Sequence, residues 1–131
     1  MRRQKKHLIM IADSDDDERG LLKAVLKLKG FRVAEAVDGR DLFCLAQAES
    51  PDLFLVNLAL PRVAEAIRRV KNHAHLRHLP LLTVCSKRPS PWQRQLAAQS
   101  TRHLTHPIEV NGFCQLIESF LSRPTRSAAV A

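Results

Sequence analysis

Short apolar runs alternate with longer amphipathic segments along this chain. Runs of the first kind are typical of β-strands, and apolar residues spaced three and four positions apart are typical of helices. We expect strands at residues 7–12, 31–36, 51–61, Leu81–Cys85 and Arg102–Thr105. We expect helices at residues 15–29, 38–48, 63–71, 91–99 and Val110–Leu121. Strands that alternate with helices in this way predict an α/β fold, with a parallel sheet covered by helices on both faces.

The segment PDLFLVNLALP, residues 51–61, is the most informative strand candidate. Its apolar residues do not alternate with polar ones, which is typical of a central strand buried on both faces, and Asn57 interrupts them. In open parallel sheets the carboxyl ends of the strands form the binding crevice. Asp13, Asn57 and either Cys85 or Ser86 each end a strand. We therefore expect these side chains at one edge of the sheet.

The chain has the length of one domain, with 131 residues and ordinary fractions of hydrophobic (45%) and charged (26%) residues. We divide it into a basic tail (1–6), a domain (7–122) and a second tail (123–131). Its three cysteines are widely spaced and odd in number, which favours a reducing compartment over a disulfide framework. No apolar run approaches the ~20 residues of a membrane span, and no secretory signal is recognisable. We therefore expect a cytoplasmic protein without a membrane partner.

The net charge of +8 is unevenly distributed along the chain. Residues 7–61 hold ten Asp or Glu against six Lys or Arg, whereas residues 62–106 hold nine Lys or Arg against Glu65 alone. A basic segment of this kind is usually a solvated face, but it can also bind an acidic partner. Nucleic-acid binding is not favoured, because the segment has no recognition motif and Trp92 is its one aromatic residue.

Four stretches of the chain are informative when they are taken together. They are IMIADSDDDERGLLKAVLKLKGF, VDGRDLFCLAQAESPDLFLVNLALP, HLRHLPLLTVCSK and LTHPIEVNGFCQLI. In this order and spacing the chain resembles the receiver domain of bacterial two-component response regulators, of the chemotaxis-regulator type, over residues 7–122. The resemblance implies a flavodoxin-like (βα)5 fold, in which a doubly wound, five-stranded parallel sheet has the strand order 2-1-3-4-5.

The resemblance also implies a phosphorylation site, and this chain departs from it. A receiver takes a phosphoryl group on an Asp that ends the third strand, four residues before a Pro, and the matching residues here are Asn57 and Pro61. Two acidic residues after the first strand hold Mg²⁺ in the family, and they correspond to Asp13 and Ser14. Asp13 is thus the one metal ligand of the family that this chain retains.

The remaining family positions lie in the second half of the chain. The Thr or Ser that ends the fourth strand corresponds to Cys85, which Ser86 follows. The Lys that precedes a Pro after the fifth strand corresponds to His106, and the aromatic switch residue before it to His103. The resemblance therefore implies a degenerate phosphorylation pocket. Its residues are Asp13, Ser14, Asn57, Cys85, Ser86 and His106.

These substitutions remove the chemistry of phosphoryl transfer. An amide does not form a stable acyl phosphate, and Mg²⁺ is usually anchored by carboxylates. Cys85 is a weak hydrogen-bond partner for a phosphoryl oxygen. We predict an atypical receiver that is not an enzyme, needs no cofactor, binds Mg²⁺ weakly or not at all, and is not switched by phosphorylation. The Asn57 amide is predicted to accept a backbone N–H and to donate to Asp13.

The resemblance also indicates a partner surface made of the fourth helix, the fifth strand and the fifth helix. In this chain it presents Trp92, Arg94, Arg102 and His103. A Trp beside Arg is typical of the residues that dominate binding energy at interfaces. The alternative is that Trp92 packs down on its own helix. We expect this surface to contact a protein of a signalling pathway, or a second copy of the chain in a homodimer.

Other interpretations stay open at this level. The chain could be a working phosphoreceiver in a phosphorelay, which Asn57 argues against, or a polyanion binder that uses the basic segment 62–106. Three histidines lie within residues 73–78, but no Cys or acidic fourth ligand is near, so a zinc site is not expected. Cys85 would suit a redox sensor if it were exposed, although a buried thiol is favoured at a strand end.

Overall fold

The structure, a computed structural model, describes residues 6–121 and contains all the predicted elements. The strands are β1 (Leu8–Ala12), β2 (Arg32–Ala36), β3 (Leu53–Asn57), β4 (Leu81–Cys85) and β5 (Arg102–Thr105). The helices are α1 (Asp16–Leu28), α2 (Gly39–Glu49), α3 (Val63–Asn72), α4 (Pro91–Ala98) and α5 (Val110–Leu121). Residues 1–5 and 122–131 lie outside the described residues, so the proposed tails and domain boundaries stay predictions.

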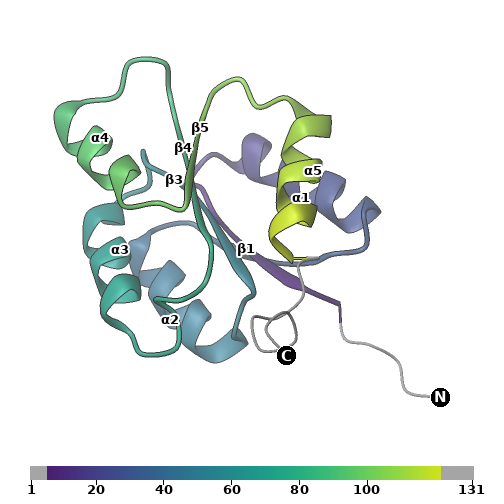
Figure 1. The fold of residues 1–131 in the computed structure, drawn as a ribbon, viewed down its shortest axis with the longest axis horizontal. Helices are drawn as coiled ribbons and strands as arrows, with labels where there is room; N and C mark the ends of the chain where they lie inside the picture. Colours follow the sequence, from purple (N-terminus) through teal and green to yellow (C-terminus); the bar gives the residue numbers. More distant parts are fainter. Residues whose placement is uncertain (1–5, 122–131) are drawn as a thin grey trace, which may run out of the picture.

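The strands form one parallel sheet in the order β2-β1-β3-β4-β5, which confirms the predicted topology. The central strand β3 pairs with β1 and β4. Helices α2, α3 and α4 lie on one side of the sheet, and α1 and α5 lie on the other (Figure 1). Because all the strands run the same way, their carboxyl ends meet at one edge, as the sequence predicted.

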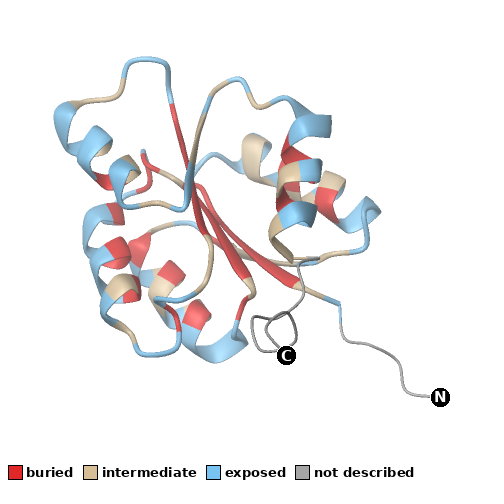
Figure 2. Ribbon diagram, viewed as in Figure 1, coloured by how far each residue is buried: buried red, intermediate tan, exposed pale blue. Residues whose placement is uncertain are grey.

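The core consists of two apolar layers, one on each face of the sheet. Leu42, Phe54 and Ile67 belong to the layer under α2 and α3, and Leu26 and Ile117 to the layer under α1 and α5. Figure 2 shows the strands as the buried centre, with the exposed residues on the outer sides of the helices. None of the helices within residues 6–121 combines the length and apolarity that a membrane crossing requires.

Strand β3 ends at Asn57, and the segment that follows is a turn rather than the further strand that its apolar sequence indicated. The N–H of Leu60 donates to the carbonyl of Asn57 at 3.0 Å, and the N–H of Leu58 donates to the carbonyl of Val84 at 2.8 Å. Leu58 and Leu60 are 0% and 2% exposed. The turn is apolar because it packs into the core, and it leaves Asn57 at the edge of the sheet.

Arg62 links this turn to α3 with a left-handed backbone, at a φ of 61°. Its carbonyl oxygen lies where a Cβ on Gly39 would have to be, and the N–H of Gly39 donates to the carbonyl of Pro61 at 2.8 Å. The start of α2 therefore contacts the turn after β3 backbone to backbone. Gly39 permits this approach because it has no side chain.

Helix α4 is anchored more sparsely than its neighbours. Leu96 is its buried residue, at 8% exposure. A hollow of about 500 Å³ lies beside it, lined by residues of α4, β5 and the β4–α4 loop. Its lining residues are Ser86, Lys87, Pro89, Arg94, Ala97, Ala98, His103 and Thr105.

Candidate functional site

Asp13 and Asn57 meet at the carboxyl ends of β1 and β3. The Asn57 Nδ2 atom donates to Oδ2 of Asp13 at 3.3 Å. The N–H of Ala59 donates to Oδ1 of Asn57 at 2.8 Å. Both hydrogen bonds predicted for the Asn57 amide are therefore present. Asp13 is only 5% exposed and Asn57 is half-buried, so the hydrogen bond between them is largely shielded from water.

The other carboxylate oxygen of Asp13 is also engaged. Its Oδ1 accepts the N–H of Asp15 at 2.9 Å. Asp15 in turn caps α1, since its Oδ1 accepts the N–H groups of Asp17 and Glu18. The acidic residues after β1 thus stabilise the positive end of the helix dipole, while Ser14 is exposed. Both oxygens of Asp13 bond to the chain itself.

Arg19 holds the loop after β1 in place from α1. Its guanidinium donates to the carbonyl of Asp13 at 2.7 Å, to Asp16 at 2.6 Å and to Glu35 at 3.0 Å. Lys23 donates to the second oxygen of Glu35 at 2.6 Å. The hydrogen bond from Lys23 lowers the pKa of Glu35 against the opposing effect of burial, and the one from Arg19 lowers it further. The hydrogen bond to Asp16 is the largest cause that raises the pKa of Arg19.

Cys85, Ser86 and His106 lie in three different surroundings. Cys85 is 2% exposed, which disfavours the redox-sensor alternative. Ser86 is exposed and lines the hollow beside α4. The His106 Nδ1 atom lies 3.6 Å from Oε2 of Glu18 on α1, although its backbone N–H donates to the carbonyl of Cys85. A single pocket that gathers all six predicted residues stays a prediction.

His103 is anchored to the sheet by a buried hydroxyl. Its Nδ1 atom lies 2.7 Å from Oγ1 of Thr83, which is 0% exposed and is its register partner on β4. Burial lowers the pKa of His103 and so favours the neutral ring. His103 therefore contributes to the predicted partner surface as a fixed, partly buried group.

The other residues predicted for the partner surface are open to solvent. Trp92 is 49% exposed, so about half of its surface is open to solvent. Arg94 and Arg102 are exposed, and Arg94 also donates to the carbonyl of Pro89 at 3.1 Å. An exposed indole and exposed guanidinium groups are of the residue types that can bind a protein partner.

Comparisons with known proteins show which family the chain belongs to. The model of the response regulator receiver domain matches residues 9–118. The chain belongs to this family. The polar-differentiation response regulator DivK of Brucella anthropi is 26% identical over 118 residues, covering 86% of this chain and 94% of DivK. Protein PilH of Pseudomonas aeruginosa is 27% identical over 119 residues, covering 87% of this chain and 97% of PilH.

A solved structure confirms the fold. The chemotaxis protein CheY4 of Vibrio cholerae matches this receiver with a TM-score of 0.78 at 21% identity, covering 89% of this chain and 100% of that one. The curated relatives and this structure are matched over nearly their whole length.

The Asp13–Asn57 pair of this receiver does not fit the Mg²⁺ ion that the family implies. Asp13 is the one carboxylate of the pair, since Asn57 is a neutral amide whose Nδ2 donates to Asp13, and Mg²⁺ is usually anchored by carboxylates. Within residues 6–121 no group of three or more His, Cys, Asp and Glu residues could hold a metal ion. The His73 ring instead accepts the N–H groups of His75 and Leu76.

The sequence interpretation missed three polar side chains that organise this region. Thr83 interrupts an apolar strand, and Arg19 looks like an ordinary surface residue of an amphipathic helix. Gln93 had a signal, because Ser90 and Gln93 have the S-x-x-Q spacing of a capping box at a helix start. The structure contains that capping box.

Proposed function

We propose that this receiver domain acts in signal transduction as a protein-interaction module whose output does not depend on phosphorylation of its own chain. The observation that carries the proposal is the neutral, hydrogen-bonded amide at the phosphoacceptor position. Asn57 uses its donor on Asp13 and its acceptor on the N–H of Ala59. The module has no enzymatic activity of its own, and we place it in the cytoplasm.

The chemistry of the amide supports this proposal. Phosphoryl transfer needs a nucleophilic oxygen with negative charge, and the amide oxygen of Asn57 is neutral. A second carboxylate beside Asp13 would repel it, whereas the amide attracts it. We therefore expect the site to hold one arrangement without an ion or a phosphoryl group, and a site with a single arrangement cannot act as a switch. The partner surface would then be accessible without phosphorylation.

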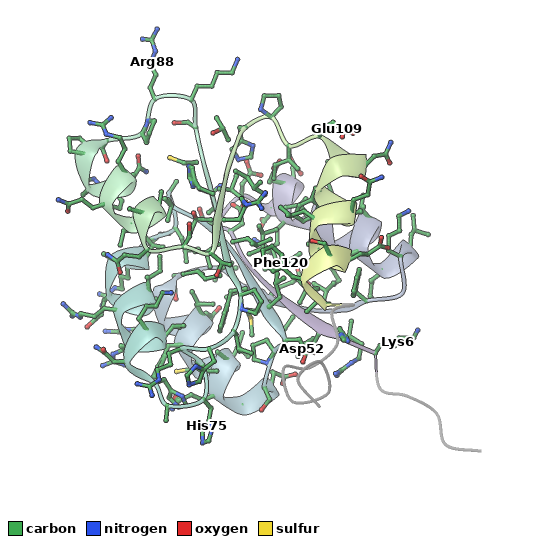
Figure 3. The ribbon with its side chains drawn as sticks, in the orientation of Figure 1. Lys6, Asp52, His75, Arg88, Glu109 and Phe120 are labelled. Atoms are coloured by element: carbon green, nitrogen blue, oxygen red, sulfur yellow. The ribbon has the colours of Figure 1, made fainter. Side chains whose placement is uncertain are left out.

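The charge and shape of this surface favour an acidic partner. Among the residues that line the hollow between α4 and β5 none is acidic, and Lys87 and Arg94 add positive charge to its alanine-rich wall. Figure 3 shows Arg88 projecting from the β4–α4 loop away from the body of the domain. A partner segment with acidic side chains around a small apolar group would complement it. A homodimer through this face would bring like charges together, so we place a different protein ahead of a second copy.

Incubation with acetyl phosphate and MgCl₂, followed by intact mass spectrometry, tests independence of phosphorylation. We expect no phosphate adduct on the wild-type protein. An adduct that is present in wild type and lost in Asn57→Ala would overturn the proposal and restore the phosphorelay alternative.

Pull-down with wild type, Trp92→Ala and Leu28→Ala tests the partner surface. Trp92 is exposed on α4, and Leu28 is 87% exposed on α1, on the opposite side of the sheet. We expect Trp92→Ala to lose a partner that wild type and Leu28→Ala both retain. Equal recovery with all three proteins would exclude this face.

A polyanion is the second candidate partner, favoured by the unpaired basic half. Arg19 and Lys23 form ion pairs with carboxylates, and within residues 6–121 none of the Lys or Arg residues of 62–102 does so. Binding to a random DNA duplex that weakens steeply with salt would support this candidate. Neutralising Arg68, Arg69 and Arg94 would then weaken it further.

A further inference from the structure

The side chain of Gln93 connects two separate parts of the fold. Its Oε1 atom accepts the N–H of Ser90 at 2.9 Å, which together with the bond from its own N–H to Oγ of Ser90 forms the capping box of α4. Its Nε2 atom donates to the carbonyl of Leu58 at 3.3 Å. The Gln93 side chain therefore caps the start of α4 and also links it by a hydrogen bond to the turn after β3.

Leu58 is the residue that directly follows Asn57, and the chain fixes both its backbone groups. Its N–H donates to the carbonyl of Val84 on β4 at 2.8 Å, and its carbonyl accepts from Gln93. Its side chain is 0% exposed. The next residue, Ala59, donates its N–H to the Asn57 amide. A continuous set of hydrogen bonds thus runs from Asp13 through Asn57 and this turn to Gln93.

The bond from Gln93 is important for α4 because the helix has few other anchors. Leu96 is the buried residue of α4, and the hollow of about 500 Å³ separates part of the helix from β5. A hydrogen bond therefore restrains a helix that apolar packing holds only weakly. Elements with few buried contacts open locally at low free energy, so a single bond can change their opening measurably.

We infer that Gln93 is the positioning residue through which the Asp13–Asn57 pair sets the position of α4 and of Trp92. This inference deepens the proposed function and rests on it in one respect, that α4 carries the partner surface. Gln93 would hold that surface in place without a phosphoryl group. The bond from Gln93 to Leu58 transmits any disturbance at Asn57 to the helix.

Gln93→Glu isolates the bond to Leu58. A Glu side chain still accepts the N–H of Ser90, so the capping box is kept, but a carboxylate cannot donate to the Leu58 carbonyl. We expect amide hydrogen exchange in residues 94–98 to become about three- to tenfold faster, with α5 unchanged. Trp92, the single tryptophan, should report the change as a shift of its fluorescence.

Gln95→Glu is the matched control, since it makes the same charge change at an exposed position of the same helix. It should leave exchange and fluorescence near the wild-type values. Ser90→Ala separates positioning from helix capping, because it removes the Oγ acceptor but leaves the bond from Gln93 to Leu58. Circular dichroism melts confirm that each variant is folded before exchange is compared.

The decisive experiment combines Asn57→Ala with these variants. Asn57→Ala should speed exchange in α4 in the wild-type and Ser90→Ala backgrounds, and should add little in Gln93→Glu. An equal effect of Asn57→Ala in all backgrounds would overturn the inference, as would a Gln93→Glu protein that behaves like Gln95→Glu. These readouts need neither partner nor phosphoryl donor, so they can succeed or fail independently of the acetyl phosphate test.

Discussion

Asn57 and Asp13, 44 positions apart in the sequence, are joined by a hydrogen bond from Nδ2 to Oδ2 at 3.3 Å. The bond joins the ends of two neighbouring strands of the sheet, β1 and β3. Together with the bond from the N–H of Ala59 to Oδ1 of Asn57, it fixes which side of the amide faces Asp13. A carboxylate at position 57 could keep the second bond but would lose the first.

Asn57→Asp should therefore destabilise the domain. The variant replaces an attractive contact to Asp13 by repulsion between two carboxylates in a poorly solvated place. We expect the free energy of unfolding at pH 7 to fall by about 1–3 kcal/mol, measured by urea denaturation. The loss should shrink as the pH falls toward about 4, because protonation of either one of the two carboxyl groups removes the repulsion.

Asn57→Ala is the control for that prediction, because it removes the hydrogen bonds without adding charge. Its loss of stability should not depend on pH in the same way, and adding MgCl₂ should stabilise Asn57→Asp but not Asn57→Ala. If Asn57→Asp were as stable as wild type at pH 7 without a divalent cation, the amide would have no stabilising role.

Arg19→Ala should cost more stability than Lys23→Ala, although both residues bond to Glu35. The Arg19 side chain is 13% exposed and also donates a hydrogen bond to the carbonyl of Asp13. The Lys23 side chain is 37% exposed and bonds to Glu35 alone. We expect a loss of about 1.5–3 kcal/mol for Arg19→Ala, as for buried hydrogen bonds to charged groups. For Lys23→Ala we expect at most about 1 kcal/mol, as for surface ion pairs. Urea denaturation at low salt measures both, and equal losses would contradict the ranking.

The sequence predicted every strand and helix within about two residues, with the exception of the end of β3. Apolar runs and helix spacing locate elements well, because each buries one face or both. They do not distinguish a strand from a buried turn, so the apolar sequence of Leu58–Leu60 predicts a strand where the hydrogen bonds form a turn. Leu21 and Leu28 show the same limit, since they continue the apolar pattern of α1 but are 56% and 87% exposed.

The site was predictable where topology alone decides it. Asp13 and Asn57 end neighbouring strands, so their contact followed from the fold, and the amide had two obvious partners. His106 was different, because its ring could turn toward Asn57 or toward α1, and strand order does not choose between them. The contact with Glu18 depends on where α1 begins and how the chain leaves β5. The hydrogen bond from Gln93 to the carbonyl of Leu58 likewise depends on the path of the β4–α4 loop.

Gly39→Ala should destabilise the domain strongly. A methyl group on Gly39 would overlap the carbonyl of Arg62, which is backbone and cannot rotate away. We expect a loss of about 1–3 kcal/mol, as for overpacked sites, measured by urea denaturation. Gly20→Ala is the control: it lies within α1 with nothing within 4 Å of the added carbon, and should gain about 0.5–1 kcal/mol. A harmless Gly39→Ala would mean that the turn after β3 is free to move.

The pH dependence of the free energy of unfolding should show the lowered pKa of His103. Burial lowers the pKa of this ring below its ordinary value of 6.5, so the unfolded chain takes up a proton more readily than the folded one. The contribution of His103 to stability is therefore fully present above pH 6.5 and is lost as the pH falls through the lower folded pKa. His103→Gln keeps a group that can bond to Thr83 but does not titrate.

We expect wild type to lose more stability than His103→Gln when the pH is lowered from about 7.5 to about 5.5. The remaining histidines and the ion pairs of Glu35 are common to both proteins, so their effects cancel in the difference. Urea denaturation at several pH values measures it. Equal pH slopes would contradict this prediction, because they would mean that the folded and the unfolded chain bind a proton at His103 with the same affinity.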